Sequence, residues 1–184
     1  MGKTIAVLLL ALTVALPFQA EATPEAASKL LSKIYDNPRI SIDEKVENLD
    51  PDTRDQVVCL ALNLYHEARG STKADLYAVG FVTKNRVNSD NHADTYCAVI
   101  WEKQYGVTQF SWTKQTLSHL LPKEKASWRR CLEIAYQIVT DDDLTDTTHG
   151  AKSFFNPVVV TPKWAVHAKK RTRIGAHVYV VPNQ

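Results

Sequence analysis

The sequence lacks an excess of charge of either sign, and this excludes several classes of protein. Its 22 Lys and Arg residues nearly balance its 20 Asp and Glu residues, leaving a net charge of +2. That balance argues against an overall polybasic nucleic-acid binder, so no nucleic-acid partner is expected. With 23% charged and 45% apolar residues, the chain is neither disordered nor fibrous, and it can build the core of one domain. We expect a monomer.

An apolar run long enough to span a bilayer is also missing. Residues 5–18 are uncharged and rich in Leu, Val and Ala, but they fall short of the roughly 20 residues that a membrane-spanning helix needs. Lys3 precedes this run, and Ala20-Glu21-Ala22 supplies the small-x-small pattern of a signal peptidase site. We predict that residues 1–22 are a signal peptide and that the protein is exported to the periplasm, the cell envelope or the exterior. Membrane contact is then transient and confined to this segment, the alternative being an uncleaved signal anchor.

Cysteine is scarce: the chain has Cys59, Cys97 and Cys131. Export permits a disulfide, and the odd count leaves one thiol unpaired or all three reduced. Cys59 and Cys131 fall on apolar stripes of predicted helices, so the alternative is that they are simply small buried side chains. The spacing does not choose a pairing.

Three helices dominate the predicted structure. After a lead-in segment at residues 23–50, Asp50-Pro51 provides an N-cap followed by Pro at the first helical position. Apolar residues then recur at helical spacing until Gly70, which predicts a helix over residues 51–69. Further helices are predicted at residues 73–87 and 123–139, and residues 88–94 form a loop. Residues 154–160 and 174–181 are β-branched and aromatic, which favours short strands or extended loops. We predict a mainly helical α+β domain over residues 51–184.

The motif His66-Glu67-Ala68-Arg69-Gly70 ends the first of these helices. A zinc protease would need His-Glu-x-x-His, and the position of the second His is Gly70 here, so that motif is absent. A carboxylate in the last helical turn feels the negative end of the helix dipole, which raises its pKa. Glu67 is therefore suited to act as a general acid near neutral pH. The alternative is a solvated carboxylate paired with Arg69 or Lys73.

A larger pattern surrounds Glu67. The run Cys59-Leu60-Ala61-Leu62-Asn63-Leu64-Tyr65-His66-Glu67-Ala68-Arg69-Gly70 resembles the opening motif of the SleB-like cell wall hydrolases. The resemblance continues in order through Ala78-Val79-Gly80, Asn85-Arg86-Val87, Tyr96-Cys97-Ala98-Val99-Ile100, Gln109-Phe110-Ser111-Trp112-Thr113, Phe155-Asn156-Pro157, Pro162-Lys163-Trp164-Ala165 and Ile174-Gly175-Ala176-His177-Val178-Tyr179. The chain departs from the family pattern at Ser71-Thr72, at Lys114-Gln115-Thr116 and at Lys152-Ser153-Phe154-Phe155. Glu67 is unaffected by these departures.

The resemblance implies a lysozyme-like fold of the lytic transglycosylase type, with a single Glu as acid and base. Glu67 would protonate the glycosidic oxygen between MurNAc and GlcNAc in peptidoglycan glycan strands, and would then take a proton from the MurNAc 6-hydroxyl. That hydroxyl would close on C1 to give a 1,6-anhydro product. No second carboxylate, cofactor or metal is needed, unlike in the usual two-carboxylate glycosidases.

Substrate-binding residues are expected in two places. Gln109, Ser111 and Trp112 belong to a block that resembles a substrate-cleft loop, although Trp112 is equally well interpreted as core. Asn156, His177 and Tyr179 are polar residues in apolar surroundings, which either line the cleft opposite Glu67 or are satisfied core groups. Asn85 and Arg86 are interpreted as structural caps or ion-pair partners.

Three other functions remain open. The first is a hydrolytic muramidase or phage endolysin that uses the same Glu with water as nucleophile. The second is a zinc amidase or peptidase built from His66, His92, His149 and His177. The third is a wall-binding protein without activity.

Overall fold

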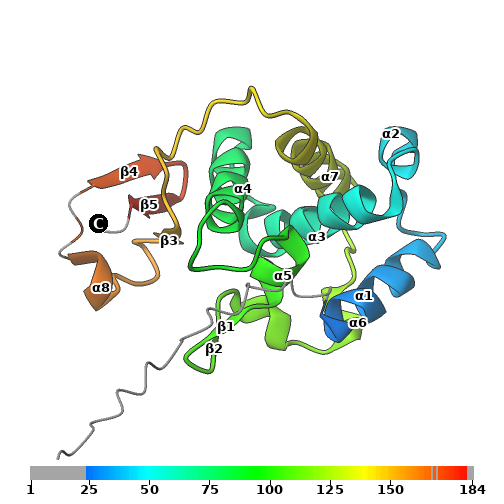
Figure 1. The fold of residues 1–184 in the computed structure, drawn as a ribbon, viewed down its shortest axis with the longest axis horizontal. Helices are drawn as coiled ribbons and strands as arrows, with labels where there is room; N and C mark the ends of the chain where they lie inside the picture. Colours follow the sequence, from blue (N-terminus) through cyan, green and yellow to red (C-terminus); the bar gives the residue numbers. More distant parts are fainter. Residues whose placement is uncertain (1–23, 167, 169, 182–184) are drawn as a thin grey trace, which may run out of the picture.

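The central element of the fold is a buried helix, α3 (Pro51–Ala68). In the computed structural model, which describes residues 24–166, 168 and 170–181, the Asp50 side chain caps this helix by accepting a hydrogen bond from the Thr53 amide at 3.0 Å. Residues 57–65 are buried without interruption, so α3 is covered on all sides rather than on one stripe. Figure 1 shows it running between the other helices. The predicted signal peptide, residues 1–22, lies outside the described residues.

Two long helices pack against α3 and against each other. They are α4 (Lys73–Val87) and α7 (Lys125–Thr140). The Thr72 side chain caps α4 by accepting from the Asp75 amide. At Gly80 the two helices come so close that an added Cβ would lie 2.3 Å from Ile138 Cδ1. The predicted helices at 51–69, 73–87 and 123–139 are thus confirmed within two residues at each end.

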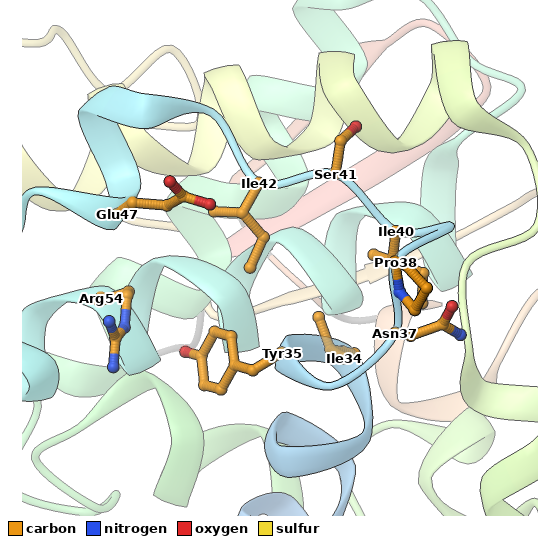
Figure 2. A pocket seen from close by; sticks show the side chains of 9 residues that line it. All are labelled: Ile34, Tyr35, Asn37, Pro38, Ile40, Ser41, Ile42, Glu47 and Arg54. Atoms are coloured by element: carbon orange, nitrogen blue, oxygen red, sulfur yellow. The ribbon is translucent and has the colours of Figure 1, made fainter.

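The N-terminal segment is part of the same core. It contains α1 (Glu25–Tyr35) and α2 (Glu44–Glu47). Leu30 and Ile34 of α1 and Val46 of α2 are fully buried. Between α1, residues 37–42 and the start of α3 lies a pocket of about 560 Å³ (Figure 2). Arg54 of α3 reaches over the Tyr35 ring in this pocket, with its guanidinium carbon 4.9 Å from the ring centroid.

A series of short elements follows α4 along the chain, and the first of them packs against α3 and α4. They are α5 (Tyr96–Trp101), the hairpin of β1 (Lys103–Gln104) and β2 (Val107–Thr108), the 3-10 helix η1 (Ser111–Lys114) and α6 (Leu117–Leu120). Tyr105 and Gly106 connect the two strands, both with positive φ, as a type I′ turn requires.

A three-stranded antiparallel sheet lies at one side of the helical body, beside α4 (Figure 1). Its strands are β3 (Ser153–Phe155), β4 (Lys170–Ile174) and β5 (His177–Val181), in the order β3-β5-β4. The short helix α8 (Lys163–Val166) precedes β4. Only the start of the predicted extended stretch at 154–160 is strand, because the amides of Val159 and Val160 turn back to the Asn156 carbonyl. The predicted class, mainly helical α+β, is confirmed.

One disulfide joins two of the helices. It links Cys59 of α3 to Cys97 of α5, across 38 residues of sequence, and leaves Cys131 as a buried free thiol. Among the described residues, no helix combines the length and the apolar character needed to cross a membrane.

Candidate active site

Glu67 lies in a cleft of about 370 Å³ at the C-terminal end of α3. Several elements meet around it. Arg86 comes from α4, Thr108 from β2, Phe154 from β3 and Trp164 from α8. The complete described lining is Glu67, Arg86, Val107, Thr108, Gln109, Phe110, Ser111, Ser153, Phe154 and Trp164. Helix α3 therefore supplies the carboxylate, and the β1–β2 hairpin, the three-stranded sheet and α8 form the walls of the cleft.

The environment of Glu67 favours its protonated form. Burial raises the pKa of its carboxyl group, and the positive charges of His177 and Arg86 oppose this rise only in part. Its place in the last turn of α3 adds the negative end of the helix dipole, which acts in the same direction as burial. A carboxyl group that keeps its proton above its usual range is fitted to donate that proton to a leaving oxygen.

Gln109 and Ser111, two of the predicted substrate-binding residues, line the cleft. Ser111 is exposed and Gln109 is half-buried. The backbone N–H of Gln109 donates to the Glu102 carbonyl at 3.2 Å, which fixes the main chain at this point of the cleft wall. The structure thus brings these two polar side chains to the same cleft as Glu67.

Trp112 is placed in the core and not in the cleft. It is 3% exposed, its Nε1 donates a hydrogen bond to Asn63 Oδ1 at 2.9 Å, and its ring stacks on His66 with centroids 4.5 Å apart. Of the two interpretations of this residue, the core one therefore describes its position. Successive side chains of a 3-10 helix lie about 120° apart, so Ser111 lines the cleft while Trp112 faces α3.

His177 and Tyr179 are held in a buried network around Asp75. Asp75 Oδ2 lies 2.9 Å from His177 Nδ1, and Tyr179 donates its hydroxyl to Asp75 Oδ1 at 2.6 Å. Burial would raise the pKa of Asp75, but these hydrogen bonds, with one from Ser71, outweigh it and lower the pKa. Both residues are thus satisfied core groups outside the described cleft lining. His177 is still near enough for its charge to act on Glu67.

Asn156 shapes a turn beside the cleft. Its side chain Oδ1 accepts from the Val158 amide at 3.0 Å, and its carbonyl accepts from two further amides. It is not among the described residues that line the cleft. This turn carries the chain toward α8 and Trp164.

Arg86, Thr108, Phe154 and Trp164 line the cleft without having been predicted as site residues. Arg86 and Trp164 do lie in sequence blocks that resemble the family, but the sequence analysis assigned neither of them to substrate binding. Trp164 is 54% exposed, so its ring is accessible from the cleft. Nothing in their local sequence separates Thr108 or Phe154 from ordinary strand residues.

The histidines of the zinc-enzyme alternative lie in separate places. His66 contacts the Leu120 carbonyl, His92 pairs with Glu102, and His177 pairs with Asp75. In the part of the chain that the structure describes, no three His, Cys, Asp or Glu side chains gather in the arrangement of a metal site.

A glutamate at the end of a buried central helix, facing a cleft walled by a small sheet and a hairpin, defines a lysozyme-like domain. The sequence profile of the Cell Wall Hydrolase family matches residues 70–180, and the chain belongs to this family. It is a peptidoglycan hydrolase. The matched range begins three residues after Glu67.

Two solved structures share the fold. The catalytic domain of the germination-specific lytic transglycosylase SleB from Bacillus anthracis is 23% identical, with a TM-score of 0.56 over 76% of this chain and 100% of that one. The catalytic domain of the Bacillus cereus SleB protein is 24% identical, with a TM-score of 0.55 over 77% of this chain and 99% of that one. No curated protein matches the sequence significantly.

Proposed function

We propose that this protein is a lytic transglycosylase that cleaves peptidoglycan between MurNAc and GlcNAc, with Glu67 as its acid and base. The observation that carries the proposal is that Glu67 is the one carboxylate among the described residues lining the cleft. Glycosidases that form a covalent intermediate or activate water commonly place a second carboxylate within about 5–9.5 Å of the first. A transglycosylase needs none, because the substrate supplies its own nucleophile.

The proposed reaction consumes no water. Glu67 donates its proton to the glycosidic oxygen, the bond from that oxygen to C1 of MurNAc breaks, and GlcNAc leaves with a new hydroxyl. The Glu67 carboxylate then takes the proton of the MurNAc 6-hydroxyl as O6 bonds to C1. This step returns Glu67 to its starting form and leaves a 1,6-anhydro ring. The cation of Arg86 lowers the pKa of Glu67, so it stabilises the carboxylate between the two proton transfers.

Exposed side chains at the cleft fit a glycan substrate. Trp164 is 54% exposed and Val107 is 60% exposed, so an apolar surface stands on the wall next to polar groups such as Gln109 and Ser111. Sugar rings present apolar faces and polar edges, and sites for them combine aromatic side chains with a few hydrogen-bonding groups. The glycan strand is accordingly proposed to lie along this cleft.

The test is digestion of purified peptidoglycan by the wild type and by Glu67→Gln. Because Gln cannot supply a proton, the variant should release soluble fragments at least about 100-fold more slowly. Glu124→Gln is the matched control, since Glu124 is an exposed carboxylate paired with Arg69, and it should keep wild-type activity. Undiminished activity of Glu67→Gln would refute the assignment.

Mass spectrometry of the wild-type products separates the two possible outcomes of cleavage. Anhydro-MurNAc ends support transglycosylation. Reducing MurNAc ends would instead establish a hydrolytic muramidase that uses the same glutamate.

A peptidoglycan substrate is consistent with a location outside the cytoplasmic membrane, and residues 1–22 are proposed as the signal peptide that exports the protein. N-terminal sequencing of protein recovered from the cell envelope tests this proposal. A mature chain that begins at Thr23 supports it, and an intact Met1 contradicts cleavage.

A further inference from the structure

Two polar atoms in the wall of the Glu67 cleft are buried without a hydrogen-bond partner among the described residues: Nη1 of Arg86 and Oγ1 of Thr108. Buried polar atoms in folded proteins are nearly always paired, so each exception calls for an explanation. Arg86 as a whole is only 6% exposed. The unpaired donor therefore belongs to a buried side chain and not to one on the surface.

The rest of the Arg86 side chain is firmly held. Its Nε donates to the Lys152 carbonyl at 2.8 Å, and its guanidinium carbon lies 5.0 Å from the centroid of the Phe110 ring. Packing on one face and a hydrogen bond on one edge fix the plane of the guanidinium group. The Nη1 donor is thus held in one direction while it lacks an acceptor, as expected of a group that awaits a ligand.

The charge of Arg86 is partly offset by a nearby carboxylate. Burial lowers the pKa of its guanidinium group to about 10, while the carboxylates of Glu102 and Glu67 act in the opposite direction. Arg86 therefore stays positively charged at neutral pH, and the carboxylate of Glu102 offsets part of this charge even while Glu67 is protonated. What its Nη1 still needs is a neutral acceptor, since Arg can only donate. Thr108, whose hydroxyl can donate as well, lines the same cleft.

We propose that Arg86 and Thr108 form a subsite that binds an amide-type carbonyl oxygen of the sugar held beside Glu67. Peptidoglycan offers that oxygen in two places: the acetamido group of either sugar and the lactyl group of MurNAc. This subsite rests on the proposed function, because both residues line the cleft assigned there to the glycan strand. It adds two substrate-binding residues, of which the sequence pattern suggested neither.

A third unpaired atom provides the control. Nε of Arg54 is also buried without a partner in the described part of the chain, but it lies in the separate pocket of Figure 2. Arg54 is in the first turn of α3 and Glu67 in the last, which at 1.5 Å per residue places their backbones about 20 Å apart. A change at Arg54 should therefore leave cleft binding unaffected.

The experiment measures binding to the Glu67→Gln protein, in which cleavage cannot remove the ligand. The variants Thr108→Val, Arg86→Lys and Arg54→Lys are added to it one at a time. Affinity is measured by calorimetry for two tetrasaccharides, a chitin tetramer that carries acetamido groups alone and a GlcNAc–MurNAc tetramer whose lactyl carboxyl groups are amidated, as they are where the peptide is attached. Thr108→Val keeps the shape of the side chain and removes only an unpaired hydroxyl, so its melting temperature should not fall.

Thr108→Val and Arg86→Lys are each expected to weaken binding about tenfold, the effect of one lost hydrogen bond, while Arg54→Lys binds like the parent. Equal weakening for both tetrasaccharides identifies the acetamido oxygen, and weakening for the MurNAc ligand alone identifies the lactyl oxygen. Unchanged affinity of Thr108→Val and Arg86→Lys for both ligands would overturn the subsite. Because the Glu67→Gln cleavage assay is separate, that result would leave the role of Glu67 standing.

Discussion

At the scale of the residue, two opposed effects determine the pKa of Glu67. Burial at the end of α3 raises the pKa of its carboxyl group, whereas the nearby cations of His177 and Arg86 lower it. The net rise means that the folded protein holds this proton more tightly than the unfolded chain does. Such a difference makes both activity and stability depend on pH.

The raised pKa of Glu67 in the folded protein determines how stability depends on pH. Glu67 favours the folded state while it is protonated, and this contribution is lost as the pH rises from the unfolded pKa, roughly 4.3, through the raised folded pKa. Glu67→Gln has no such loss, so it should be more stable than the wild type at neutral pH and no more stable near pH 4. Urea unfolding of both proteins across this range measures the difference. A difference that does not change with pH would show that the pKa of Glu67 is not raised.

The rate of peptidoglycan cleavage should also depend on the protonation of Glu67. As a general acid, Glu67 must be protonated at the start of each turnover, so the rate should fall as the pH rises through its folded pKa. A pH–rate profile of peptidoglycan solubilisation gives this value directly. An alkaline limb that begins near the ordinary glutamate pKa would contradict the argument from burial.

At the scale of the element, the hairpin of β4 and β5 is seated on one side chain of α4. Asp75 accepts hydrogen bonds from the Ala176 amide at 3.2 Å and from the Tyr179 hydroxyl at 2.6 Å. Gly175 opens the two-residue turn with a φ of +57°, and the pair Ile174 and His177 closes it, the pattern of a type II′ turn. The position of His177 near Glu67 thus depends on this contact between the sheet and the N-terminus of α4.

Substitution of Gly175 tests how tightly the hairpin is seated. A Cβ there would lie 2.8 Å from Asp75 Cβ, and the positive φ adds strain of its own. Gly175→Ala should lower the free energy of unfolding by about 2–4 kcal/mol, the sum of backbone strain and overpacking. Gly150→Ala is the control: its φ is +86° but no atom lies within 4 Å of the added Cβ, so about 1–2 kcal/mol is expected. Equal losses in denaturant unfolding would contradict the close contact with Asp75.

At the scale of the whole molecule, the disulfide between Cys59 and Cys97 ties the central helix to α5 across 38 residues. Closing a loop of this length limits the unfolded chain, and the usual gain is about 2–4 kcal/mol. A reductant should therefore lower the unfolding free energy of the wild type by this amount. The double variant Cys59→Ala, Cys97→Ala should not respond to reductant, and a wild type that is equally insensitive would contradict the pairing.

Cys131 supplies an internal check on that experiment. Burial raises the pKa of its thiol to about 12, so it is neither a thiolate nor accessible in the folded protein. Alkylation of the native, oxidised protein should modify no cysteine, and alkylation after unfolding without reductant should modify one. Mass spectrometry distinguishes these states.

Local signals were enough to place the long helices. Asp50-Pro51 and Gly70 bound α3, Thr72 caps α4, and the ends of both helices depend on residues next to them in sequence. The position of Glu67 at the end of α3 follows from the same signals. For Gln109 and Ser111, resemblance to the family suggested a cleft that the structure does contain.

Other parts of the site depend on distant segments. Arg86 was interpreted from sequence as a cap or an ion-pair partner, yet its unpaired Nη1 is evident only once Lys152, Phe110 and β2 surround it. Trp112 and Ser111 are neighbours in sequence but point in different directions: the Trp112 indole binds Asn63 on α3, and Ser111 lines the cleft. The local sequence did not indicate the role of Asp75, because its hydrogen-bond partners lie about 100 residues later in the chain.

The sequence by itself determined the long helices, the single domain and the candidate acid, because caps, helical periodicity and an ordered series of motifs are all local features. The tertiary structure decided which cysteines pair, which aromatic residue faces the cleft and which buried polar atoms lack a partner among the described residues. These depend on the direction in which each side chain points once sheet, hairpin and helices have packed. A side chain's direction is fixed by contacts with residues far away along the chain, and no local pattern records them.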